Sequence, residues 1–95
     1  MPQELQKPLS VESDSQAIEL IRAWAAKGGL VCSLNPGAWP ADQAAIAWGV
    51  LLSDIARHVA DALHQHHNLE QAAVLGRIRT VFDYRPSAGT KGKFI

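Results

Sequence analysis

The segment Gly29-Leu30-Val31-Cys32-Ser33-Leu34 is a short apolar run between stretches that have the pattern of amphipathic helices. Its alternation predicts a β-strand with Leu30, Cys32 and Leu34 on one face and Val31, Ser33 and Asn35 on the other. A single strand leaves a row of backbone N–H and C=O groups without partners. The identity of the segment that pairs with this strand is therefore the main structural question that the sequence raises.

The stretch before the strand predicts a first helix. Ser13 and Gln16 have the spacing of a capping box, which places the start at Ser13 or Asp14. An apolar stripe at helical spacing follows, formed by Ala17, Leu20, Ile21 and Trp24. Gly28-Gly29 would end the helix, because glycine adopts the left-handed cap conformation without strain. Residues 1–12 precede it as a flexible arm, with a short extended piece at Leu9-Ser10-Val11.

The longest predicted helix runs from about Ala41 to His66. A continuous stripe of buried side chains is expected along one face, formed by Trp48, Leu52, Ile55, Val59 and Ala62. Gly49 lies inside this helix, where glycine costs about 1 kcal/mol relative to alanine. We therefore expect Gly49 to mark a close crossing with a neighbouring element.

The stretch that follows has two interpretations. Asn68 can cap a third helix, with Gln71 at the capping-box position and an apolar stripe formed by Val74, Leu75, Ile78, Val81 and Phe82. Residues 77–85 also alternate as a strand does, although the continuous stripe from Val74 favours a helix. Residues 86–95 are predicted to form a basic, flexible tail.

These segments predict an α+β fold, mostly helical, in the order helix, strand, helix, helix, with one globular domain over residues 13–85. Three segments could pair with the single strand: residues 8–12, residues 77–85, or the same strand of a second chain. We favour pairing across a homodimer about a twofold axis, because it does not require a weakly patterned segment to form a strand.

Composition sets limits on function. The chain has 95 residues, of which 47% are hydrophobic and 19% charged, as in globular domains. One cysteine permits no intrachain disulfide, and no apolar run of about 18 residues is present. We expect no signal peptide, because the first residues do not combine a basic segment with an apolar one. A cytoplasmic protein without membrane attachment is expected. Nucleotide-binding glycine loops, C-x-x-C and G-x-S-x-G are absent, so the sequence predicts no cofactor and favours no enzyme activity.

A few polar side chains are weak candidates for chemistry. Asp54, His58 and Asp61 share one face of the long helix, and a carboxylate beside an imidazole can ligate a metal or orient a base. His64, His66 and His67 follow at its end, but they do not converge on one face of a single helix. Charge pairs on a solvated helix face and cations at a helix C-terminus explain both sets without any such chemistry, and the sequence favours that interpretation. Cys32, between two leucines, is expected to be a small apolar side chain rather than a nucleophile.

Trp39 and the basic end of the chain are candidates for contacts with partners. Trp39 follows Asn35-Pro36-Gly37, and its ring either covers the edge of the core or meets another molecule. Residues 1–75 hold four basic and eight acidic side chains, a net charge of −4. Residues 76–95 hold five basic and one acidic, a net charge of +4. The basic side chains are too scattered to predict more than weak nucleic-acid binding. They are Arg77, Arg79, Arg85, Lys91 and Lys93.

Three stretches together resemble a small bacterial family of unknown function, found mainly in proteobacteria. They are residues 23–36, residues 47–60 (Ala-Trp-Gly-Val-Leu-Leu-Ser-Asp-Ile-Ala-Arg-His-Val-Ala) and residues 74–83. The similarity covers roughly residues 15–84. It implies no activity, substrate or site, and it supports the helical interpretation of residues 74–83.

The sequence thus predicts a small, non-catalytic, homodimeric interaction or regulatory module. Its expected interface consists of Leu30, Val31, Cys32, Ser33, Leu34, Asn35 and Trp39, and an unidentified protein is a further potential partner. The first alternative is a protein that binds a metal or small molecule, for which the candidates are Asp54, His58, Asp61, His64 and His67. The second alternative is weak nucleic-acid binding by the basic end.

Overall fold

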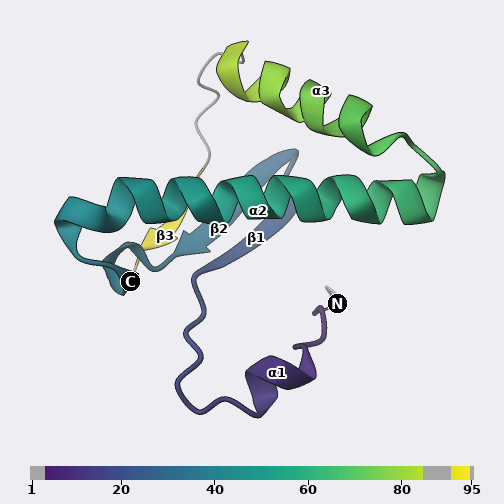
Figure 1. The fold of residues 1–95 in the computed structure, drawn as a ribbon. Coiled ribbons are helices and arrows are strands. Elements are labelled where there is room, and N and C mark those ends of the chain that lie inside the picture. Colours follow the sequence, from purple (N-terminus) through teal and green to yellow (C-terminus); the bar gives the residue numbers. More distant parts are fainter. Residues whose placement is uncertain (1–3, 85–90, 95) are drawn as a thin grey trace.

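The computed structural model describes residues 4–84 and 91–94 as a mostly helical α+β fold (Figure 1). A β-hairpin precedes two helices, and a third strand follows them. In chain order the elements are α1 (Leu9–Glu12), β1 (Ile21–Ala26), β2 (Gly29–Leu34), the 3-10 turn η1 (Pro36–Ala38), α2 (Ala41–His67), α3 (Gln71–Tyr84) and β3 (Lys91–Phe94). None of the helices within these ranges is both long and apolar enough to span a membrane.

The first predicted helix is wrong, because its second half forms strand β1. The turn between β1 and β2 decides this outcome. Lys27 and Gly28 have positive φ angles of 52° and 75°, as the two central residues of a tight type I′ hairpin turn require. The sequence pattern predicts a helix C-cap at Gly28-Gly29. The turn instead brings β1 back along β2, and antiparallel pairing overrides the helical preference of an alanine-rich segment.

Strand β2 is confirmed, and it lies at the centre of a three-stranded sheet of order β1-β2-β3. β1 is antiparallel to it, with facing pairs from Ile21↔Leu34 to Ala26↔Gly29. β3 is parallel to it, with pairs from Val31↔Lys91 to Leu34↔Phe94. Both edges of β2 are therefore paired within its own chain. The predicted pairing of this strand across a twofold axis is not what the structure shows, and neither 8–12 nor 77–85 is its partner.

The segment before the sheet also differs from the prediction. Residues 9–12 form the single turn of α1 rather than an extended piece, and Ser13 ends that turn instead of starting a helix. The backbone N–H of Gln16 donates to Asp14 Oδ1 at 2.9 Å in a local turn. Figure 1 shows this part of the chain apart from the helical pair.

The two long helices are confirmed, and the strand interpretation of residues 77–85 is wrong for the described residues up to Tyr84. Asn68 does not start α3. It ends α2 in the left-handed conformation, and its backbone N–H donates to the carbonyl of His64 at 2.9 Å. Glu70 caps α3 instead, since its Oε2 accepts the N–H of Ala73 at 2.8 Å. Of the predicted basic tail, residues 91–94 form β3; residues 86–90 and 95 lie outside the described residues, as does Arg85.

The core of the single chain is small. Within the described residues, Ala60 on α2, at 3% exposed, is the one fully buried apolar side chain. The whole chain exposes 8436 Å², whereas a folded monomer of its 10.3 kDa mass is expected to expose about 5,400 Å². The radius of gyration of 15.1 Å likewise exceeds the expected value of about 12.4 Å. The fold therefore leaves unusually much surface uncovered.

Candidate functional site

The predicted polar face of α2 is partly used for contacts within the chain. Asp61 accepts hydrogen bonds from the side-chain amides of Gln65 at 3.1 Å and Gln71 at 3.0 Å. The second bond ties the start of α3 to α2. Asp54 and His58 are exposed on the same helix. In residues 4–84 and 91–94, no group of three or more His, Cys, Asp or Glu side chains is arranged to hold a metal ion.

The histidines lie in the last turn of α2, as predicted. Nδ1 of His64 is 2.8 Å from the carbonyl oxygen of Leu69, across the connection to α3. The rings of His66 and His67 are tilted against each other, with centroids 5.7 Å apart. This arrangement is explained by the turn between the helices and by the favourable position of histidine at a helix C-terminus.

The expected interface residues lie in and just after β2, where the backbone is already paired. Leu30 is 54% exposed near the hairpin turn, whereas Val31 to Asn35 are half-buried, including the free thiol of Cys32. Trp39 is also half-buried, and its ring meets that of Trp48 edge-on, with centroids 5.6 Å apart and an interplanar angle of 86°. Trp39 therefore packs against the first half of α2, and a contact with a partner stays a prediction.

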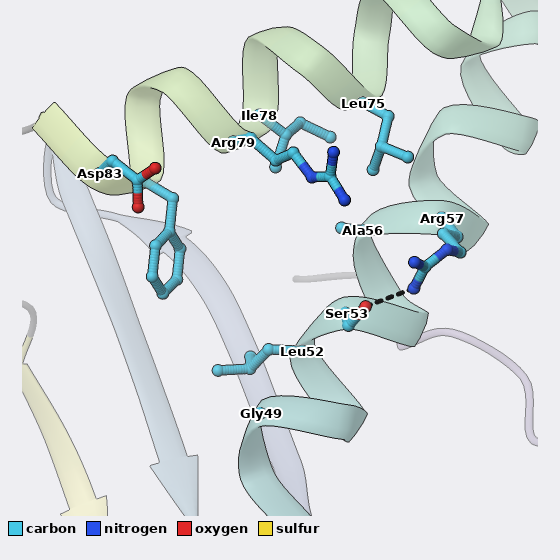
Figure 2. A pocket seen from close by; sticks show the side chains of 10 residues that line it. Gly49, Leu52, Ser53, Ala56, Arg57, Leu75, Ile78, Arg79 and Asp83 are labelled. Carbon is cyan, nitrogen blue, oxygen red and sulfur yellow. Dashed lines mark hydrogen bonds between the residues drawn. The ribbon is translucent and has the colours of Figure 1, made fainter. Parts of the chain in front are cut away.

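Sequence reasoning missed a groove between α2 and α3 as a site (Figure 2). Its volume is about 420 Å³. Small residues of α2 and apolar side chains of both helices form most of its lining, which consists of Gly49, Leu52, Ser53, Ala56, Arg57, Leu75, Ile78, Arg79, Phe82 and Asp83. The signal was present in the sequence, because Leu52 belongs to the apolar stripe of α2, and Leu75, Ile78 and Phe82 belong to that of α3.

Charged side chains lie among the apolar lining of the groove. The guanidinium of Arg57 donates to the Ser53 hydroxyl four residues earlier on α2, as the dashed line in Figure 2 shows. Arg79 and Asp83 contribute charges of opposite sign from α3. Among the described residues these two form no ion pair with each other, since the one ion pair there joins Arg22 to Glu19.

The groove combines an apolar lining with charged side chains. The free energy falls when another apolar surface covers leucine, isoleucine and phenylalanine side chains, because their apolar area is removed from water. Phe82 is 73% exposed and Leu52 is 42% exposed, so much of this stabilisation is not realised in the single chain. The groove therefore suits an apolar partner surface with charges near its margin.

Comparisons with known proteins agree with the fold and name a family. The model of the "Domain of unknown function (DUF5076)" matches residues 4–89. A solved structure from the photosynthetic bacterium Rhodopseudomonas palustrus CGA009, described as that of a "putative pyruvate dehydrogenase", is similar at 32% identity with a TM-score of 0.69. The match covers 96% of this chain and 94% of that one. No curated protein sequence matches.

The resemblance to a small bacterial family of unknown function is thus confirmed. The family model spans more than half of the chain, including the hairpin, α2 and α3. The chain belongs to the DUF5076 family of domains of unknown function.

Proposed function

We propose that this chain is a non-catalytic interaction module that works as a homodimer. The observation that carries the proposal is the incomplete core: a surface of 8436 Å² for a chain with one fully buried apolar side chain among its described residues. The excess over a typical monomer is about 3,000 Å². Obligate homodimers bury about 2,000–5,000 Å² over both chains, which is about 1,000–2,500 Å² of each chain, so one interface accounts for between a third and most of this excess.

The exposed side chains are of the type that an interface buries. Ile46, Val50, Val59 and Val81 are between 40% and 76% exposed on α2 and α3. Single exposed apolar side chains are normal on monomers, but large contiguous patches mark contact surfaces. Val50 lies about 180° around α2 from Val59, so these side chains are spread around the helices. Their presence on both α2 and α3 supports a partner that contacts the helices.

The description of the Rhodopseudomonas protein raises dehydrogenase activity as another function. Oxidative decarboxylation of a 2-oxo acid requires a cofactor that accepts electrons, and such a cofactor needs several polar contacts. The groove described above is lined mainly by small and apolar side chains. We therefore prefer the interaction module for this chain.

Sedimentation velocity with multi-angle light scattering tests the proposal on the full chain from about 1 to 100 µM, a range that brackets micromolar dissociation constants. We expect a particle of twice the 10.3 kDa chain mass. We also expect unfolding in urea to shift to higher denaturant as the protein concentration rises, because association stabilises the folded state. A particle of single-chain mass at every concentration would disprove the proposed function.

A further inference from the structure

We propose that the groove between α2 and α3 is the surface on which a second copy of this chain docks, with the helical pair of one chain packed against that of the other. This inference rests on the proposed function and assigns its interface. In a twofold arrangement the same surface serves both chains, so each groove is covered by the partner's α2 and α3.

Gly49 is the first observation that points to a second copy. A Cβ atom built at Gly49 would meet nothing within 4 Å in the described chain, although this glycine lies in the middle of α2. No described element makes the close crossing that the sequence predicted at this position, and Gly49, unlike the equally open Gly76, lies in the lining of the groove. Glycine in a helix permits the backbone of another element to approach closely. Ser53 and Ala56, four and seven residues later, extend this small face along α2.

The apolar stripe of α2 is the second observation. Leu52, Ile55 and Val59 follow one another at helical spacing on the face that the sequence predicts to be buried. They are nevertheless 42%, 37% and 40% exposed. A stripe with the pattern of a core face that is still more than a third exposed along a 27-residue helix can bury further apolar surface against another element. Of its three side chains, Leu52 also lines the groove. A second α2 with its own uncovered stripe has the matching length and chemistry.

Phe82 is the third observation. It continues the apolar stripe of α3 from Leu75 and Ile78, which are half-buried, and yet it is 73% exposed at the end where α3 departs from α2 (Figure 1). An aromatic side chain at the open end of an apolar groove has the character of an interface anchor.

The charges of the groove favour a copy of this chain over a partner of one charge sign. Arg57 and Arg79 are basic and Asp83 is acidic. A surface that carries both signs can place its acidic side chain against a basic one of an identical surface when a twofold axis relates the two. A strongly acidic or strongly basic partner would meet like charge on part of the same surface.

Two matched glycine variants test the assignment, both in the full chain. Gly49→Leu fills the groove, whereas Gly76→Leu adds the same side chain to α3. Gly76 lies about 160° around the helix from Ile78, and its Cβ position is equally open. Both changes improve helix propensity by a similar amount. We expect Gly49→Leu to raise the dimer dissociation constant about 100-fold, because the clash occurs twice in a symmetric interface, and Gly76→Leu to leave it unchanged.

A second pair of variants keeps the test valid if Gly49→Leu fails to fold, which circular dichroism would reveal. Phe82→Ser removes the proposed anchor, and Tyr84→Ser removes an 82% exposed aromatic on the opposite side of α3. We expect the first to weaken the dimer about 30-fold and the second to have no effect. If the wild type is a dimer, and Gly49→Leu and Phe82→Ser dissociate no more easily than their control variants, the docking surface is overturned but the proposed function is not. A monomeric wild type would overturn both.

Discussion

The hairpin of β1 and β2 and the helical pair of α2 and α3 differ in how much of their stabilisation one chain supplies. The hairpin has facing pairs along its full length and a tight turn at Lys27 and Gly28. The backbone groups that face each other between β1 and β2 are paired without any other molecule. The helical pair depends on apolar side chains, and one of those in its groove, Phe82, is 73% accessible to solvent. We infer that backbone pairing stabilises the hairpin locally, whereas the helices depend on a partner.

The largest effect is expected from placing a charge in the stripe of α2. Leu52→Asp should lower the free energy of unfolding by about 3 kcal/mol. The variant loses the apolar contacts of the leucine and in addition has to remove a carboxylate partly from water. Urea unfolding at two protein concentrations measures this, and we expect the concentration dependence to disappear. Leu52→Met, which keeps the volume, should cost less than about 1.5 kcal/mol. Equal stabilities of the two variants would contradict the distinction between hairpin and helices.

The junction between the two regions should give the next largest effect. Trp39→Ala removes the edge-on contact with Trp48, and since both rings are half-buried we expect a loss of about 2 kcal/mol. Trp39→Phe should recover about half of it. The same urea experiment distinguishes the two roles of Trp39. A loss that is equal at high and low protein concentration assigns it to the core of one chain, and a loss that depends on concentration assigns it to the dimer interface.

A change in the hairpin turn should have a smaller effect that is independent of concentration. Gly28 has a φ of 75°, a conformation that costs an L-residue about 1–2 kcal/mol. Gly28→Ala should therefore destabilise the chain by about 1 kcal/mol. Gly29→Ala is the control, because its Cβ position is open and no positive φ is needed there; a change within about 0.5 kcal/mol is expected. Dimer dissociation by Gly28→Ala would refute the local nature of the hairpin.

The smallest effect is expected at the start of β1. Arg22 Nε donates to Glu19 Oε2 at 2.7 Å, and this hydrogen bond and the carboxylate charge raise the pKa of Arg22. A raised pKa of a basic group adds stability that is lost only as the pH rises through the folded-state value, which for arginine lies far above neutrality. Arg22 should therefore cause no pH dependence between about pH 5 and pH 9. Both side chains are exposed, so Glu19→Gln should leave the melting temperature unchanged in calorimetry at either pH.

The regions that the sequence predicted correctly are those where an apolar stripe at helical spacing continues over several turns. The stripe from Trp48 to Val59 indicates α2 alone, and the stripe from Val74 to Phe82 favoured α3 over the alternative strand because it begins before residue 77. Residues 21–26 carry a short stripe that fits either a helix or a strand. Their outcome depended on the φ angles of Lys27 and Gly28, which a Gly-Gly pair in the sequence does not reveal.

The remaining features depend on contacts between distant segments. The residues of β3, with two lysines and a glycine among the first three, have no strand pattern of their own. They become a strand because β2 offers an unpaired edge. To predict the groove from the sequence, one would have to know that Leu52 and Ile78 line a common space. Each apolar stripe is visible in the sequence, but their relative placement is not. The metal-site alternative joined Asp54 to His58 and Asp61 on one helix, and no second element in the described chain adds a ligand.

The position of β3 in the sheet has a consequence for the order of folding. In β2, Val31 faces Trp24 of β1 across the two-residue hairpin turn. It faces Lys91 of β3 only after about sixty intervening residues. Hairpins close within about 1–10 µs, whereas parallel strands far apart in sequence assemble more slowly. During folding β2 therefore passes through a stage with one edge open. At that stage a strand from another molecule can take the place of β3, so exchange of this strand is the route to misassembly that this topology carries.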